Sequence, residues 1–294
     1  MRNNKKTSLV ILLLTYVIAA IVAIMTFQLV PSSQLWIKVL IADVVATIVV
    51  YCIGCLFQNA SIYDPYWSVA PPFVMVALMI FKMDDSWGTI LVFFVVTLWA
   101  VRLTYNWFVT FQNLNHQDWR YDMLQEKSGK LYPLVNFLGI HLFPTLIVYG
   151  CLLPIILFID GGFGSTVFRS LGQTMLMILG CSLSVVAISM QFISDAQMQK
   201  FRRNPDNKNK YITSGLWKHS RHPNYLGEIL MWWGIFLAIG LMNHVFLFVG
   251  PLLNTLMFLF ISIPMAENRL RGYKEGYDEY VMRTRILLPF ARKS

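Results

Sequence analysis

Long apolar runs alternate with short polar gaps along almost the whole chain, from Ser8 to Pro264. A helix needs about 20 consecutive apolar residues to cross a hydrocarbon layer roughly 30 Å thick. Eight runs are candidates: 8–30, 35–57, 68–83, 87–110, 134–159, 172–196, 224–242 and 244–264. The third run is short and begins near Pro71 and Pro72, so seven crossings are the alternative. The pattern predicts an all-α, polytopic transmembrane helical bundle.

Lys and Arg residues are concentrated in alternate gaps between these runs. Of the 24, 20 lie within residues 2–6, 120–130, 200–221 and 269–293, and Arg102 lies near the same end of its run. The opposite gaps hold Lys38, Lys82 and Arg169. Because cytoplasmic loops are enriched in Lys and Arg, eight crossings place both termini in the cytoplasm. We therefore expect a multi-pass protein of the cell membrane whose first run is an anchor rather than a cleaved signal.

Composition agrees with a lipid-embedded chain. Hydrophobic residues make up 56%, charged residues 13%, and the mean hydropathy is +0.56. The net charge of +9 follows the topology and forms no single basic patch, so we expect the bilayer, and no nucleic acid, as a partner. All four cysteines lie inside apolar runs, where they are expected to pack as small hydrophobes; no metal site is predicted.

Several expected cytoplasmic segments are more polar and aromatic than a connection requires. The segment 59–67 holds Asp64 among Tyr63, Tyr66 and Trp67. It is either a helix boundary with interfacial aromatics or a site built around a partly buried acid. Arg102 lies inside a run, so it should face the bundle interior or reach the lipid headgroups.

One polar stripe follows the end of the sixth run. Gln191, Asp195, Met198 and Arg202 are spaced i, i+4, i+7 and i+11, which places them on one helical face. A pair between Asp195 and Arg202, with basic side chains that reach the lipid headgroups, explains the polar end of the stripe. It does not explain Gln191, which lies more than two turns deeper in the apolar run.

The seventh run opens with polar residues. Pro223 suits a helix start, and Asn224 and Glu228 share one face with Arg221 nearby. The carboxylate is either stabilised by the helix N-terminus or part of a site for a phosphate or amide-bearing ligand. After Glu267 and Tyr273, the tail at 277–290 suits either a surface helix or a cover over that site.

These segments together resemble a known family. The string RHPNYLGE at 221–228, Ser194 with Asp195, and the tail from Tyr280 to Pro289 are similar to the steroid 5-alpha-reductase superfamily. The segments at 59–67, 102–103 and 118–121 resemble its bacterial membrane branch. The resemblance covers roughly 58–290, which divides the chain into an N-terminal transmembrane hairpin, 1–57, and a reductase-like membrane domain, 58–294.

Membership in that superfamily implies NADPH held at the cytoplasmic ends of the last spans. A reductase of this type delivers hydride to a carbon–carbon double bond conjugated to a carbonyl group. The substrate would be a lipophilic small molecule. By similarity, and with Gln191 from the polar stripe, the cofactor-binding residues would be Arg120, Gln191, Asp195, Arg202, Arg221, Asn224, Tyr225, Glu228 and Tyr273.

The sequence departs from the family at the residue that would donate the proton. Trp99 stands where the resemblance places a catalytic tyrosine, and an indole cannot donate a phenolic proton. Asp64, with Tyr63 or Tyr66, is therefore the expected catalytic group.

Two other functions remain open. Membrane methyltransferases of the isoprenylcysteine and phospholipid type share the RHPxYxG core, and Glu267 fits them too, so S-adenosylmethionine is an alternative cofactor. A non-enzymatic, lipid-binding membrane protein is the third hypothesis.

Overall fold

The computed structural model describes residues 4–241 and 244–288. Arg2, Pro289 and Lys293, which contribute to the expectations above, lie outside the described residues, as does position 242 of the seventh run. The described chain is helical, and its only β-type pairing is an isolated bridge between Ser220 and Arg285. It divides into two compact units, residues 1–166 and 167–294. The boundary expected between 57 and 58 concerns the resemblance and stays a prediction.

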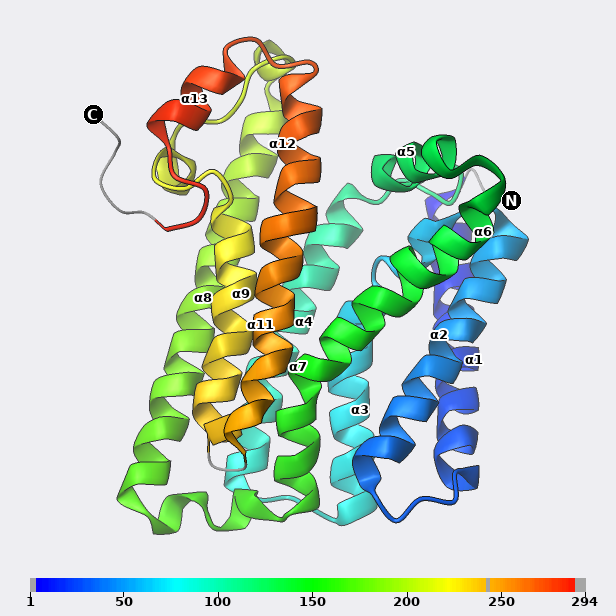
Figure 1. Cartoon of the computed structure of the whole chain (residues 1–294), viewed down its shortest axis with the longest axis vertical. Helices are drawn as coiled ribbons and strands as arrows, with labels where there is room; N and C mark the ends of the chain where they lie inside the picture. Colours follow the sequence, from blue (N-terminus) through cyan, green and yellow to red (C-terminus); the bar gives the residue numbers. More distant parts are fainter. Residues whose placement is uncertain (1–3, 242–243, 289–294) are drawn as a thin grey trace. The chain divides into compact units, whose positions relative to one another are not determined.

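The first unit contains the helices from α1 to α7 (Figure 1). They are α1 (Lys5–Leu29), α2 (Leu35–Phe57), α3 (Tyr66–Lys82), α4 (Trp87–Thr110), α5 (Trp119–Ser128), α6 (Tyr132–Val135) and α7 (Phe143–Asp160). A 3₁₀ turn, Ala60–Tyr63, precedes α3. A π-helical turn, Asn136–Leu142, joins α6 to α7. Pro71 and Pro72 lie inside α3, which nevertheless continues unbroken from Tyr66 to Lys82.

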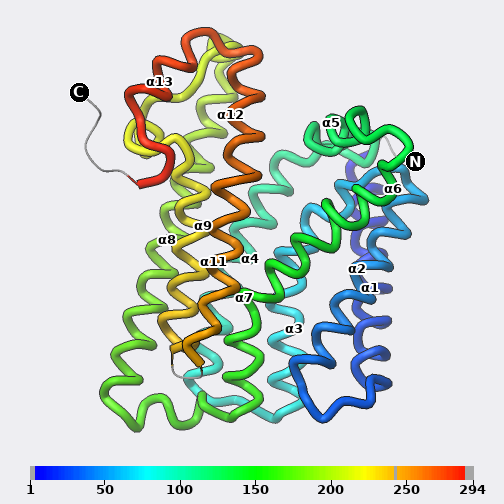
Figure 2. The backbone as a smooth tube through the Cα atoms, in the orientation of Figure 1, coloured from blue at the N-terminus to red at the C-terminus, as the bar shows by residue number. Residues whose placement is uncertain are grey.

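The second unit contains the remaining helices. They are α8 (Leu171–Arg203), α9 (Pro223–Ile235), α11 (Val249–Met257), α12 (Ile263–Arg271) and α13 (Tyr277–Arg283). A π-helical turn extends α9 to Gly240, and another, Phe258–Ser262, joins α11 to α12. Figure 2 shows α9 running alongside α8, and the chain after α12 turning back through α13.

The all-helical membrane bundle is confirmed. The third run, whose prolines were the reason for the alternative of seven crossings, is among the segments that can cross a membrane. Seven helical segments of the described chain are long and apolar enough to cross a membrane. They are Lys5–Leu29, Leu35–Phe57, Ala60–Lys82, Trp87–Thr110, Trp119–Asp160, Leu171–Arg203 and Val245–Arg271. The seventh expected run is helical from Pro223 to Gly240 but is not among them.

Small residues hold α8 and α9 unusually close together. A Cβ added at Gly180 of α8 would lie 2.3 Å from the backbone nitrogen of Ala238. A Cβ at Gly227 of α9 would lie 2.4 Å from Cγ of Gln191, and one at Gly234 would lie 2.3 Å from Oγ of Ser184. Small residues let membrane helices approach closely, where van der Waals packing rather than the hydrophobic effect holds them. This contact fixes which side chains of α8 and α9 face each other.

Candidate functional site

A buried carboxylate lies between α8 and α9. The side chain of Glu228, in the second turn of α9, belongs to a residue that is 4% exposed. Its Oε2 accepts a hydrogen bond from Nε2 of Gln191 at 3.3 Å, and its Oε1 accepts one from Nε1 of Trp232 at 3.2 Å. Gln191 of α8 is fully buried. The structure thus brings together the polar stripe of α8 and the polar face of α9, two features singled out in the sequence.

Two amide oxygens beside this carboxylate have unused hydrogen-bonding capacity. Oε1 of Gln191 and Oδ1 of Asn224 are both buried, and neither has a hydrogen-bond partner among the described residues. Asn224 lies one helical turn before Glu228 on α9. Buried polar atoms are nearly always paired in folded proteins, with protein groups or with ordered water, so these two acceptors are available to a donor from a ligand or a water molecule. The residues of α8 and α9 therefore offer carbonyl and carboxylate oxygens to a ligand that carries N–H or O–H groups.

The other residues that the resemblance assigns to the cofactor in this unit differ in exposure. Asp195 is buried one turn beyond Gln191, whereas Arg202 is exposed near the end of α8. The ring of Tyr225 stacks on His222 at a centroid distance of 5.3 Å and lies 4.8 Å from the ring of Phe258. Tyr273 is exposed, and Nζ of Lys274 lies 4.9 Å from its ring centroid.

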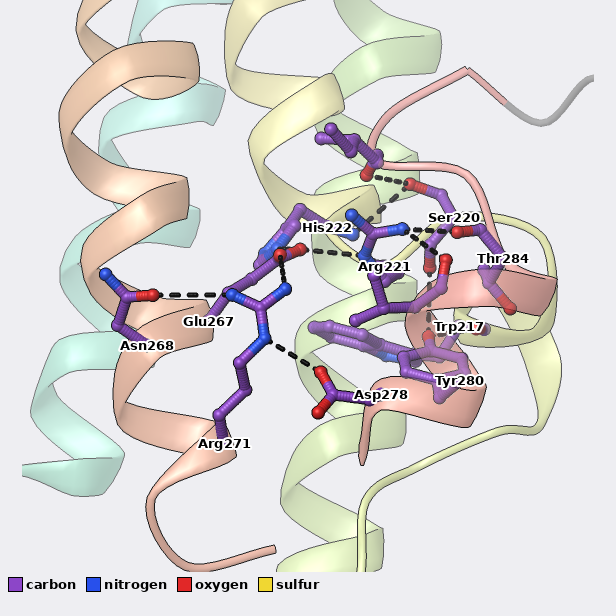
Figure 3. A network of polar contacts seen from close by, with 12 residues as sticks. Trp217, Ser220, Arg221, His222, Glu267, Asn268, Arg271, Asp278, Tyr280 and Thr284 are labelled. Carbon is purple, nitrogen blue, oxygen red and sulfur yellow. Dashed lines mark hydrogen bonds and ion pairs between the residues drawn. The ribbon is translucent and has the colours of Figure 1, made fainter. Parts of the chain in front are cut away.

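Arg221 binds the protein's own groups (Figure 3). Its Nε donates to Oε1 of Glu267 at 2.7 Å, and both side chains are more than 90% buried. Its Nη1 donates to the carbonyl oxygens of Val281, at 3.1 Å, and Thr284. Nε2 of His222 lies 3.1 Å from the same carboxylate oxygen. The resemblance assigns Arg221 to the cofactor, whereas the structure places its guanidinium where it ties α9 to α12 and to the C-terminal segment.

Residues 277–288, here called the C-terminal clasp, fold back onto the segment before α9. The backbone N–H of Arg221 donates to the carbonyl of Arg285 at 2.9 Å, and that of His222 to the carbonyl of Ile286 at 3.2 Å. The hydroxyl of Tyr280 donates to the carbonyl of Trp217. Burial raises the pKa of the Tyr280 hydroxyl, so it remains a protonated donor at neutral pH.

Two further contacts hold the clasp and the segment on which it packs. Nε of Arg271 donates to Oδ1 of Asp278 at 2.9 Å, which fixes the start of α13 to α12. The indole of Trp217 donates to the carbonyl of Ser194 at 3.1 Å, which fixes the segment beneath the clasp to α8. Tyr277 and Tyr280 are buried, so α13 docks inward through its aromatic side chains.

In the first unit, two of the sequence motifs pack against each other. Nδ2 of Asn59 donates to the carbonyl of Leu114 at 2.7 Å, and the backbone N–H of Asp118 donates to Oγ of Ser61 at 2.8 Å. The hydroxyl of Tyr121 donates to Oδ1 of Asp64 at 2.6 Å. Tyr121 is thus the tyrosine that the structure pairs with Asp64.

Arg120 lies beside this pair. Its Nε donates to Oδ1 of Asp118 at 2.8 Å, and its guanidinium carbon lies 5.6 Å from the ring centroid of Tyr121. Its charge is therefore shared between the Asp118 carboxylate and the tyrosine ring.

The hydroxyls of Tyr63 and Tyr66 point elsewhere. Tyr63 shares a hydrogen bond of 2.8 Å with Oγ1 of Thr145, and Tyr66 donates to Oδ1 of Asp43 at 3.0 Å. The structure therefore does not bring either hydroxyl to Asp64. Trp99, at the position where the resemblance places a tyrosine, is fully buried with its ring edge-on to Trp67.

Sequence reasoning missed three polar residues of this unit. Asp43 is the only acid in α2, and this was visible in the sequence. An acid inside an apolar span usually has a functional role, because its burial in lipid is costly. Tyr121 lay within a motif already noted, but its pairing with Asp64 depends on the fold. His141, fully buried on the π-helical turn, carried no local signal.

The remaining candidate ligands are the histidines, acids and cysteines that could bind a metal ion. Within residues 4–241 and 244–288, no three His, Cys, Asp or Glu side chains lie close enough together to hold a metal ion. Cys52 and Cys55 are exposed on α2, whereas Cys151 and Cys181 are buried.

Comparison with known proteins gives the family. The sequence model of a family of proteins of unknown function, DUF1295, matches residues 50–284. An uncharacterised protein of Schizosaccharomyces pombe is 25% identical over 207 residues, which cover 61% of this chain and 57% of the yeast protein. The chain thus matches little more than half the length of that curated relative, and no solved structure matches it. Because the family model covers most of the sequence, the chain belongs to the DUF1295 family.

Proposed function

We propose that the chain is an NADPH-dependent membrane reductase of the steroid 5-alpha-reductase type. It would reduce a carbon–carbon double bond conjugated to a carbonyl group in a lipophilic substrate. The observation that carries this proposal is the set of buried acceptors on α8 and α9, namely Glu228 and the unpaired amide oxygens of Gln191 and Asn224.

The donor set of a nicotinamide cofactor fits these acceptors. Its carboxamide carries two N–H donors, and the site offers a carboxylate and two amide oxygens in an apolar helix pair. Lys200, Arg202 and Arg203 at the end of α8 supply positive charge for the phosphate groups. NADPH, when bound, supplies the hydride. Gln191, Asn224, Tyr225 and Glu228 would hold and orient the nicotinamide end.

Asp64 and Tyr121 support the acid half of the reaction. Reduction of an enone consumes one proton as well as one hydride, and Trp99 cannot supply it. The Tyr121 hydroxyl is hydrogen-bonded to Asp64 at 2.6 Å, so a proton on Asp64 can replace one that Tyr121 donates to a carbonyl oxygen. Tyr63 and Tyr66 stay candidates for this role, although their hydroxyls are bound to Thr145 and Asp43.

The bilayer is the proposed source of the substrate. Much of the surface of the spanning helices consists of exposed large apolar side chains, as on α1 and α4. A lipophilic molecule dissolved in the membrane can reach such helices without crossing water. The distribution of Lys and Arg supports a cell-membrane protein whose cofactor site faces the cytoplasm.

The first test is cofactor binding by the purified full-length protein. NADPH at 100 times its dissociation constant should stabilise the protein by about 2.7 kcal/mol, seen as a higher melting temperature. Glu228→Gln should remove most of this stabilisation, because it replaces the charged acceptor in the site. Glu279→Gln is the matched control, since that side chain is largely exposed on α13 and should leave the shift unchanged.

Other results of the same assay would replace the proposal. A melting shift with S-adenosylmethionine and none with NADPH would favour a membrane methyltransferase, for which Glu267 is the residue held in common. A shift with neither cofactor would favour a non-enzymatic, lipid-binding protein.

A further inference from the structure

An acidic side chain lies inside the first unit with no counter-charge. Asp43, in the third turn of α2, is 9% exposed, and the Tyr66 hydroxyl donates to its Oδ1 at 3.0 Å. Among the described Lys, Arg and His residues, none forms an ion pair with it. An ionised carboxylate buried in an apolar bundle needs a cation or several donors to offset its desolvation. One neutral hydroxyl does not meet that need.

A chain of hydroxyl groups leads away from Asp43. The Tyr66 hydroxyl also interacts with the side chain of Thr47. Oγ1 of Thr47 lies 2.9 Å from Oγ1 of Thr145, which in turn lies 2.8 Å from the hydroxyl of Tyr63. All four of these side chains are buried. They come from α2, from the segment around the start of α3, and from α7, so the fold assembles the chain from distant parts of the sequence.

A basic nitrogen lies near the far end of this chain. The imidazole of His141 is fully buried, with its centroid 4.8 Å from that of the Tyr63 ring. Its Nδ1 lies 3.0 Å from the carbonyl oxygen of Asn136, so the proton is assigned to Nδ1 and the lone pair to Nε2. Nε2 has no hydrogen-bond partner among the described residues.

We propose that Asp43 is a proton-binding site inside the first unit and that the hydroxyls of Tyr66, Thr47, Thr145 and Tyr63 form its relay. Each hydroxyl can donate one hydrogen bond while it accepts another, so a proton can pass along the chain by successive transfers without movement of the backbone. When Asp43 binds a proton, an O–H bond forms at its carboxylate and each hydroxyl gives up one proton as it receives another. A hydronium ion supplies the proton that restores the last hydroxyl and is left as water, so every hydroxyl ends neutral.

The groups around Asp43 are compatible with a neutral, protonated carboxyl. The titratable side chains nearest to it on the neighbouring elements are Tyr63, Tyr66 and Tyr149, all neutral phenols at pH 7. Tyr16 on α1 contacts the ring of Tyr66. On its own helix, Lys38 lies over the ring of Phe27, 4.7 Å from its centroid.

Infrared spectroscopy of the full-length protein in phospholipid nanodiscs tests the proton site. Below neutral pH the spectrum should contain the carbonyl stretch of a protonated carboxyl group, and Asp43→Asn should remove that band. Asp160→Asn is the control, because Asp160 is paired with Lys82 at 2.7 Å and should be ionised. A spectrum in which Asp43→Asn removes only carboxylate absorption would overturn the proposal.

Two milder variants test the relay and do not depend on the folding of Asp43→Asn. Tyr66→Phe should shift the band to higher frequency, because the carbonyl loses its hydrogen-bond donor. Thr145→Val should keep the band but slow its shift in D₂O several-fold, because the exchange path is cut. Thr97→Val, in α4, is the control. An unchanged band in Tyr66→Phe would refute the Asp43 assignment, and unchanged exchange in Thr145→Val would refute the relay.

The proton site shares Tyr63 and Tyr66 with the candidate acids of the reductase proposal, but its test has a separate readout. Its infrared band should be present whether or not NADPH binds, and Asp43→Asn should still bind whichever cofactor the native protein binds. The infrared band therefore tests the proton site alone, and cofactor binding tests the reductase proposal alone.

Discussion

Replacement of Arg221 by alanine should lower the free energy of unfolding by about 3–5 kcal/mol, the usual effect of removing one partner from a buried ion pair. The substitution removes the closest cation from the buried Glu267 carboxylate, which keeps only His222 at 3.1 Å and Arg271 at 3.7 Å. It also removes the donor to the carbonyls of Val281 and Thr284. The C-terminal clasp should then detach before the rest of the unit unfolds. Limited proteolysis should show faster cleavage after Arg283 and Arg285, and denaturant unfolding should give the loss of stability.

Arg283→Ala is the matched control for unfolding. That arginine reaches Glu279 only at 3.9 Å, and both side chains are mostly exposed, so its removal should change stability little. Arg221→Lys separates charge from geometry, because an ammonium group cannot reproduce the fork of donors that Arg221 uses. Equal stability of Arg221→Ala and the native protein would mean that the clasp is not held by this residue.

Gly180→Ala should be nearly as damaging, although it adds a single methyl group. The new Cβ would lie 2.3 Å from the backbone nitrogen of Ala238 and 2.4 Å from the carbonyl oxygen of Gly234. Neither atom can move without displacing α9, so the helix pair must separate. Overpacking of this kind costs about 1–3 kcal/mol, and more where backbone must shift. Because Gln191 and Glu228 lie on the same two helices, cofactor binding should weaken along with thermal stability.

Gly172→Ala is the control on the same helix. The nearest atom to its added Cβ, Oγ of Ser170, is 4.0 Å away, so the substitution fits and should stabilise α8 slightly through helix propensity. If Gly180→Ala matched Gly172→Ala in melting temperature and in cofactor binding, the close approach of α8 and α9 would not be what positions the site.

The spanning helices could be read from hydropathy because lipid imposes a length and an apolar surface on each of them. α2 and α4 have the bounds expected from the sequence, 35–57 and 87–110. The ends of other helices depend on polar residues that hydropathy ignores. α8 continues to Arg203, beyond the expected 196, because its polar stripe remains helical past the apolar run.

The candidate site was predictable where helical periodicity decides the geometry. Spacing alone placed Asn224 and Glu228 on one face of α9, and Gln191 on a stripe of α8 that could oppose it. Spacing could not show that Arg221 binds Glu267, since the two residues are 46 positions apart and meet only through the fold. Nor could it show that Tyr63 and Asp64, neighbours at a 3₁₀ turn, direct their side chains to different partners.

The most direct measurement is a density map of the full-length protein prepared with both NADPH and S-adenosylmethionine. The reductase proposal predicts a dinucleotide bound to the second unit, with its carboxamide hydrogen-bonded to Gln191 or Asn224 and its phosphates near the basic end of α8. Density for S-adenosylmethionine at these residues, or a dinucleotide bound without contact to Gln191, Asn224 or Glu228, would contradict it.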